Sequence, residues 1–233
     1  MFKNMKALKA AFPNTIPVLT GYLVLGMAYG ILMESKGYPF YWSLAFSAFC
    51  FGGSMQFVAV TLLTSVFDPL QAFLLSIMVN ARHIFYGISL LKTYKGLGFI
   101  KNFLIFWLSD ETFSVVSTVE PPKDVERKEF YFWVSILDYS YWLIGTVLGG
   151  LLGSLISFDT NGIDFVLTAL FVVLFIEQWK KRENRIFCIL GVVCTVISRV
   201  IFGSSNLVIP AMVILVIMLL PLYIYKNRGG NKS

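Results

Sequence analysis

The sequence predicts an all-α integral membrane protein, a bundle of several transmembrane helices. Hydrophobic residues make up 57% of the 233 residues and charged residues only 14%, against roughly 25% charged residues in soluble domains. Long apolar runs approach or exceed the roughly 18 residues that a helix needs to cross a bilayer. These runs lack the period-2 alternation of transmembrane strands, so helices are expected and a barrel is not.

Charge and cysteine content narrow the function classes. The net charge is +6, but the basic residues lie mainly in short loops and tails, where they orient spans, so we expect no nucleic-acid partner. Cys50, Cys188 and Cys194 fall within apolar runs at spacings that match no zinc or disulfide framework. With one histidine and no serine nucleophile motif, the chain offers poor metal ligation. We expect no metal, no cofactor and no enzymatic activity.

Eight apolar segments follow one another with short connections and predict a single transmembrane domain over residues 1–233. The first is expected to be a spanning helix rather than a removed signal peptide, because Pro13 and Pro17 come early and no cleavage site stands out. The longest polar connector covers residues 120–129. The segments are 16–33, 42–66, 70–91, 103–119, 130–156, 163–179, 186–202 and 206–225.

The distribution of lysine and arginine predicts the orientation. If every segment crosses the membrane, the side that holds both termini carries 13 basic residues and the opposite side carries four. Basic residues favour the cytoplasmic side, so both termini are expected there. The outer loop 92–101 contains three lysines and departs from this pattern, which suggests that a neighbouring segment is re-entrant instead of spanning.

Segment 42–66 is the candidate for such an interruption, because it contains Gly52, Gly53 and Ser54 in succession. Adjacent glycines favour a helix break, which membrane proteins tolerate where it lines a cavity. The freed backbone groups, with Gln56, suit the two ends of a zwitterion. The alternative is close packing of small residues at a helix crossing. Such packing is also expected of the glycines in the first and fifth segments: Gly21, Gly26, Gly30, Gly145, Gly149 and Gly153.

Segment 70–91 carries polar residues at mid-membrane depth. In a regular helix Asn80, His83 and Gly87 share one face, whereas Arg82 lies about 100° from His83. A charge at this depth is costly and normally faces a protein interior or a watery cavity. The functional interpretation puts Asn80 and His83 on a substrate path and pairs Arg82 with a carboxylate. The alternative is an internal ion pair that fixes the register of the helices.

The carboxylate is expected in the fourth segment, where Asp110 and Glu111 lie near the centre. Two adjacent carboxylates in lipid should not both be ionised and unpaired, so at least one pairs with a cation or holds a proton. We predict that Arg82 contacts one of them; the alternative is a helix end in a shorter span. A protonatable carboxylate near His83 suits proton coupling, since histidine titrates near physiological pH. Asp138 also lies deep in its segment.

A short internal similarity runs through the chain. Gly26 and Gly30 recur as Gly145 and Gly149 at an offset of 119, and the motif at 82–87 resembles that at 199–203 at an offset of 117. Many transporters are built from repeats. The two interpretations are an internal repeat and chance similarity between apolar segments.

Four motifs, taken in order, resemble the AzlC family of bacterial inner-membrane proteins. They are AFPNTIPVLTGYLVLGMAYG at 11–30, GGSMQF at 52–57, NARH at 80–83 and SDETF at 109–113. The resemblance implies the large subunit of a branched-chain amino acid exporter in the bacterial cytoplasmic membrane, working with a small membrane partner of the AzlD type. It implies leucine, isoleucine, valine and methionine as substrates. The motif positions that it carries over are Gln56, Asn80, Arg82, His83, Asp110 and Glu111.

We therefore predict proton-coupled export of apolar amino acids by alternating access. The alternatives are a secondary carrier of another small solute and an assembly subunit that transports nothing. The expected substrate-binding residues are Gly52, Gly53, Ser54, Gln56, Asn80 and His83. The expected ion-pair or proton-coupling residues are Arg82, His83, Asp110 and Glu111.

Overall fold

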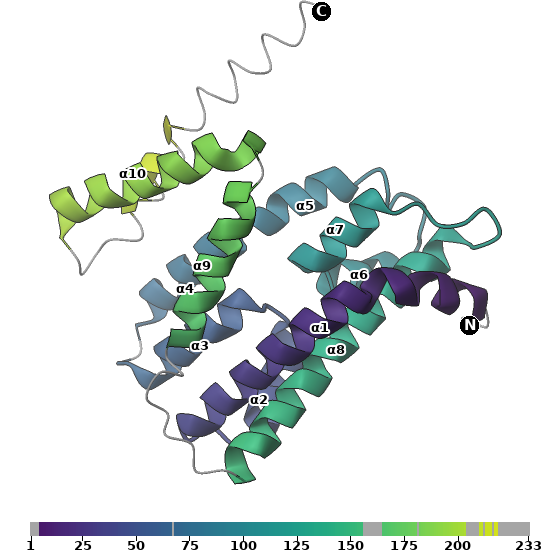
Figure 1. The fold of residues 1–233 in the computed structure, drawn as a ribbon, viewed down its shortest axis with the longest axis horizontal. Helices are drawn as coiled ribbons and strands as arrows, with labels where there is room; N and C mark the ends of the chain where they lie inside the picture. The colour runs from purple at the N-terminus through teal and green to yellow at the C-terminus, as the bar shows by residue number, and fades with distance from the viewer. Residues whose placement is uncertain are drawn as a thin grey trace, which may run out of the picture. The chain divides into compact units, whose positions relative to one another are not determined.

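The computed structural model describes residues 5–66, 68–155, 165–180 and 182–203, together with 210–211, 213–215 and 217–218. Every regular element in these ranges is a helix (Figure 1), so the predicted all-α class is confirmed for the described part of the chain. The chain divides into two compact units, Met1–Leu167 and Thr168–Ser233. The second unit contains most of α9 (Phe165–Lys180), the 3-10 turn η1 (Arg182–Asn184) and α10 (Arg185–Phe202).

Three described helices are long and apolar enough to cross a membrane: α1 (Met5–Ser35), α8 (Arg127–Leu155) and α10. A fourth span is formed if α4 (Pro69–Asn80) and α5 (Arg82–Leu90), which are bent by 42° relative to each other, are taken together. The molecule is therefore a helical membrane protein. The predicted set of eight apolar segments stays a prediction, because several segments are divided into shorter helices and most of 206–225 lies outside the described residues.

The first spanning helix begins earlier in the sequence than the predicted segment 16–33. Helix α1 begins at Met5 and passes through Pro13 and Pro17 without interruption. Side chains beside the prolines bond to carbonyls of the preceding turn: Asn14 Nδ2 donates to Ala10 O at 2.8 Å, and Thr15 Oγ1 donates to Phe12 O at 3.0 Å. Such local bonds help membrane helices to tolerate proline.

Helices α1 and α8 lie side by side and form the centre of the first unit (Figure 1). Gly26 contacts Gly145, and Gly30 contacts Gly149, so the two helices run in the same direction with their backbones touching. A Cβ atom at Gly145 would lie 2.8 Å from Tyr22 O, which no real side chain allows. The predicted packing of these glycines is confirmed, but Gly21 has nothing within 4 Å of its Cβ position.

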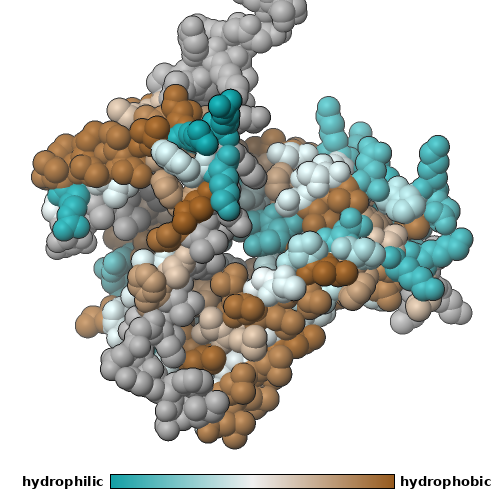
Figure 2. All heavy atoms as spheres, viewed as in Figure 1, coloured by the Kyte–Doolittle hydropathy of each residue, from teal (hydrophilic) through white to brown (hydrophobic). Residues whose placement is uncertain are grey.

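The pairs of glycines in contact are those related by the offset of 119, and the internal repeat itself stays a prediction. Because α1 and α8 are parallel, their first turns lie at the same end of the unit. There Lys6 Nζ on α1 lies 3.4 Å from Asp124 Oδ2, just before α8. Figure 2 shows hydrophilic side chains around this end and mainly hydrophobic ones further along both helices.

Three of the predicted segments are each interrupted in the middle. Segment 42–66 forms α2 (Phe40–Cys50) and α3 (Ser54–Thr64), so the predicted break at Gly52 and Gly53 is confirmed, with Gly53 at a φ of 42°. Segment 103–119 is divided between α6 (Ile100–Phe106) and α7 (Asp110–Thr118). Segment 70–91 bends between α4 and α5 at Ala81, so its treatment as one regular helix was wrong.

Candidate functional site

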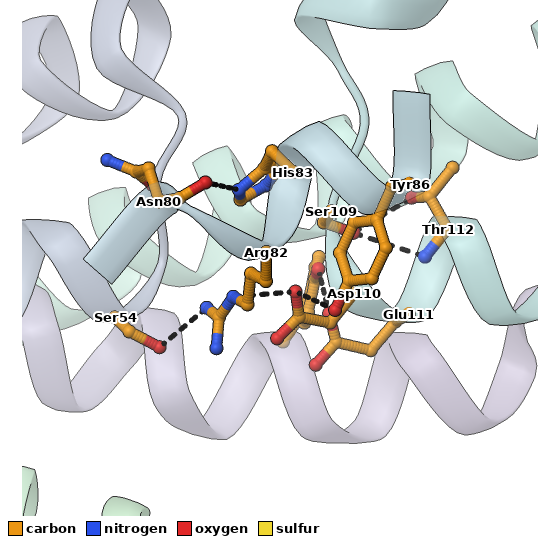
Figure 3. A network of polar contacts seen from close by, with 10 residues as sticks. Ser54, Asn80, Arg82, His83, Tyr86, Ser109, Asp110, Glu111 and Thr112 are labelled. Atoms are coloured by element: carbon orange, nitrogen blue, oxygen red, sulfur yellow. Dashed lines mark hydrogen bonds and ion pairs between the residues drawn. The ribbon is translucent and has the colours of Figure 1, made fainter. Parts of the chain in front are cut away.

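Arg82 is the first residue of α5 and reaches the beginnings of two other helices (Figure 3). Its Nη2 donates to Ser54 Oγ, in the first turn of α3, at 3.3 Å. Its Nε lies 3.1 Å from Oδ1 of Asp110, the first residue of α7. The Nε–H is not aligned with the carboxylate, so this contact is an ion pair rather than a hydrogen bond. The prediction that Arg82 contacts Asp110 or Glu111 is confirmed, and Asp110 is the partner.

Two tyrosines donate to the adjacent carboxylates of α7. Tyr86, one turn along α5 from Arg82, donates its hydroxyl to Asp110 Oδ1 at 3.1 Å. Tyr22 on α1 donates to Glu111 Oε2 at 2.6 Å. The Tyr86 ring stacks on Phe113 with ring centroids 4.3 Å apart, which fixes the phenol in position. Asp110 therefore has a cation and a hydroxyl as partners, whereas Glu111 has a hydroxyl.

Gln56 is fully buried and connects both sides of the α2–α3 break to α8. Its Oε1 accepts from Trp142 Nε1 at 2.8 Å and from Gly52 N at 3.3 Å, and its Nε2 donates to Ser47 Oγ at 2.8 Å. Ser47 also lies 3.0 Å from the Thr146 hydroxyl. A primary amide can make four such bonds. Three are used on Trp142, Gly52 and Ser47, and the side chain also interacts with the Tyr29 hydroxyl, so Gln56 holds the broken helix in place.

Asn80 and His83 lie apart from the Arg82 contacts (Figure 3). Asn80 Nδ2 donates to Ser76 O in its own helix at 3.0 Å, and His83 Nδ1 lies 3.3 Å from Asn80 O. The His83 ring contacts the Tyr86 ring edge-to-face with centroids 5.5 Å apart. The structure therefore brings Arg82, Ser54, Asp110 and Glu111 together, but it keeps the Asn80 side chain on its own helix.

The sequence-based list of site residues omits Asp138, which lies on α8 with none of its surface exposed. Its Oδ2 accepts from Thr112 Oγ1 at 2.7 Å, and Thr112 belongs to the same SDETF motif as Asp110. The available signal was the depth of a carboxylate within an apolar segment. The list also omits Tyr22, Tyr86 and Trp142, for which spacing alone gives no signal because their partners are distant in sequence.

The Arg82 side chain thus connects the first residues of α3, α5 and α7. Helix N-termini carry unpaired N–H groups and a partial positive charge that favour carboxylates, and neighbouring acidic side chains suit an ammonium group. Broken helices with this arrangement are typical of substrate sites in secondary transporters. Among the described residues, no group of three or more His, Cys, Asp or Glu side chains is placed to hold a metal ion.

Comparisons with known proteins relate the chain to a family of membrane proteins. The chain matches a family model described as AzlC protein over residues 17–156. It is 46% identical over 206 residues to the branched-chain amino acid transport protein AzlC of Bacillus subtilis, covering 88% of this chain and 81% of that protein. It is 40% identical to a membrane protein of Helicobacter pylori, over 94% of this chain and 96% of that one. It is 25% identical to the inner membrane protein YgaZ of Escherichia coli, over 73% of each chain. No solved structure matches the chain.

Proposed function

Because the chain belongs to the AzlC protein family, we propose that it exports branched-chain or similar apolar amino acids across the bacterial cytoplasmic membrane. The substrates are valine, leucine, isoleucine and methionine, and the proton gradient drives their efflux. The meeting of three helix breaks around Arg82 carries this proposal. The name of the Bacillus subtilis relative supports the substrate class.

The substrate zwitterion binds between the beginnings of α3 and α7. Its carboxylate takes the backbone N–H groups of Gly53 and Ser54 at the start of α3, where the helix dipole favours an anion, and Gln56 holds this helix start in place. Its ammonium group faces Asp110 and Glu111. This binding is selective only in a site that excludes water, since electrostatic interactions weaken strongly in water.

Arg82 holds α3 and α7 together between transport steps. A substrate that competes for Ser54 or Asp110 loosens this connection, so the Arg82 contacts change as the site opens and closes. Asn80 and His83 line the path beyond the ion pair. The rings of His83 and Tyr86 are in contact, which links that path to the Asp110 carboxylate.

A small membrane protein of the AzlD type completes the transporter, and both termini lie in the cytoplasm. The contact between Lys6 and Asp124 supports this orientation, because it brings two segments that each contain three lysine or arginine residues to one end of the first unit. Basic residues collect on the cytoplasmic side of membrane proteins.

The test measures efflux from proteoliposomes that are loaded with labelled valine, leucine, isoleucine or methionine. The chain is reconstituted alone and with its small partner, with and without an imposed pH gradient. We expect efflux that requires Arg82 and Asp110: Arg82→Ala and Asp110→Asn should each abolish it. Asp68→Asn is the matched control, because Asp68 is a carboxylate that caps α4 away from the site and asparagine caps equally well.

Three other results would contradict parts of the proposed function. Efflux of a different solute alone would identify a carrier with another specificity. No flux with or without the partner would favour an assembly subunit. Unchanged efflux in a variant that combines Arg82→Ala, His83→Ala and Asp110→Asn would refute the site.

A further inference from the structure

Asp138 is a buried carboxyl group with too few partners for an ion. It lies on α8 with no exposed surface. Its Oδ2 accepts one hydrogen bond, from Thr112 Oγ1, and its Oδ1 is buried with no hydrogen-bond partner among the described residues. An ionised carboxylate has about four acceptor sites to satisfy. An ion in this position would lose its hydration without gaining hydrogen bonds that replace it.

The charges around Asp138 do not supply the missing compensation. Glu111 of α7 is the charged side chain that acts on it directly, and Glu111 is itself an acid. Tyr22 of α1 and Tyr141 of α8 are close enough to be influenced by Asp138 but are neutral. Arg82 is paired with Asp110. No basic side chain of α2 or α6, the other helices packed on α8, acts on Asp138 in the described part of the chain.

A chain of hydroxyl groups leads from Asp138 to the break between α6 and α7. The Ser109 hydroxyl donates to Thr112 Oγ1 at 3.0 Å, and the Thr112 hydroxyl donates to Asp138 Oδ2 at 2.7 Å. Both hydrogen bonds point towards Asp138. Ser109 directly precedes Asp110, so the row of hydroxyl groups begins beside the proposed substrate site.

We propose that Asp138 holds the proton that is exchanged during transport and that Ser109 and Thr112 form its route. A proton arriving at Ser109 Oγ displaces the Ser109 hydroxyl proton to Thr112 Oγ1. The Thr112 hydroxyl proton then moves to Asp138 Oδ2, so one proton enters at Ser109 and one is bound at Asp138. This role deepens the proposed function and rests on it for coupling, whereas the protonated state of Asp138 can be tested without transport.

Infrared spectroscopy of the purified, reconstituted protein tests the protonated state. We expect the carbonyl stretch of a buried carboxylic acid at neutral pH, shifted when the sample is exchanged into heavy water. The isosteric variant Asp138→Asn should lose this band, and the matched control Glu111→Gln should keep it. A band that survives in Asp138→Asn, or that disappears in Glu111→Gln, would overturn the assignment.

Transport by the same preparations tests the role in coupling. A pH gradient should stimulate efflux by the wild type. Asp138→Asn should retain exchange of labelled for unlabelled amino acid at equal pH but lose stimulation by the gradient. Thr112→Val, which removes the hydroxyl route, should slow the gradient-driven step while Asp138 still shows its band.

The outcomes separate this proposal from the proposed function. If the wild type exchanges none of the four amino acids, the substrate assignment fails, and the infrared band still decides whether Asp138 is protonated. If the wild type exchanges them and Asp138→Asn remains fully gradient-driven, the proton role of Asp138 is refuted alone. If folded Asp138→Asn loses exchange and gradient-driven efflux equally, the residue is structural and the proposal falls.

Discussion

Gly30→Ala should separate the two helices at the centre of the first unit. A Cβ atom at Gly30 would overlap Thr146 O and would lie 2.5 Å from Gly150 N and 2.9 Å from Gly149 C. Carbon atoms in contact need about 3.5–4.0 Å, so α1 and α8 would have to move apart. All the obstructing atoms are backbone, which cannot rotate away. Overpacking of this kind costs about 1–3 kcal/mol.

Gly21→Ala is the matched control on the same helix. Nothing lies within 4 Å of its Cβ position, and alanine is favoured over glycine within a helix by about 1 kcal/mol. The control should therefore be neutral or more stable than the wild type. The two variants, which add the same methyl group nine positions apart, should differ by about 2–4 kcal/mol when these costs are combined.

Unfolding of the purified protein in mixed micelles, titrated with a denaturing detergent, measures this difference. Tryptophan fluorescence is a suitable signal, because Trp142 lies beside Gly26 at the helix contact. Equal midpoints for Gly30→Ala and Gly21→Ala would refute the close approach of α1 and α8. A lower midpoint for Gly21→Ala than for Gly30→Ala would contradict the packing register.

Three further predictions concern individual side-chain bonds. Trp142→Phe removes the donor to Gln56 Oε1 and should cost about 1–3 kcal/mol, measured by the same titration. Asp68→Ala removes the acceptor for two N–H groups at the start of α4 and should cost about 1 kcal/mol; no change in midpoint would contradict the cap. Arg82→Ala and Asp110→Asn should be non-additive, with a coupling of about 0.5–3 kcal/mol in a double-mutant cycle; strictly additive effects would contradict the ion pair.

Part of this arrangement could be predicted because it follows from single positions. Hydropathy predicts helices in a membrane whatever their packing. Adjacent glycines at 52 and 53 predict a break, since glycine is the least favourable helix residue after proline. The pairing of Arg82 with Asp110 was predictable because an isolated charge in lipid requires a partner, and the described spans offer few carboxylates.

The bend at Ala81 could not be predicted from local sequence. No glycine or proline lies beside it, and the residues around it are compatible with a continuous helix. Arg82 beyond the bend is bound to Ser54 and Asp110, whereas Asn80 before it bonds back to its own helix. Contacts with distant segments therefore accompany the change of direction, and a periodicity argument that assumes one regular helix assigns the wrong faces.

The break before α7 carried a local signal, and the structure agrees with the alternative interpretation that Asp110 and Glu111 lie at the end of a shorter helix and not near the centre of a span. Ser109 accepts a hydrogen bond from Thr112 N, which makes it an N-cap, and two acidic residues follow in the first turn of the helix. Serine followed by acidic residues is a standard helix start. The mean hydropathy of the segment does not reveal such a helix start, because the residues on both sides of it are hydrophobic.

The stability of the α1–α8 pair and the geometry of the site depend on the same contacts. Three side-chain hydrogen bonds join this pair to α3 and α7. They are Tyr22–Glu111, Trp142–Gln56 and Asp138–Thr112. Tyr22 and Trp142 also contact each other edge-to-face, with ring centroids 5.4 Å apart. Gly30→Ala should therefore impair transport by the fraction that remains folded as well as reduce that fraction. Efflux per folded molecule equal to that of Gly21→Ala would show that the pair supports the site without positioning it.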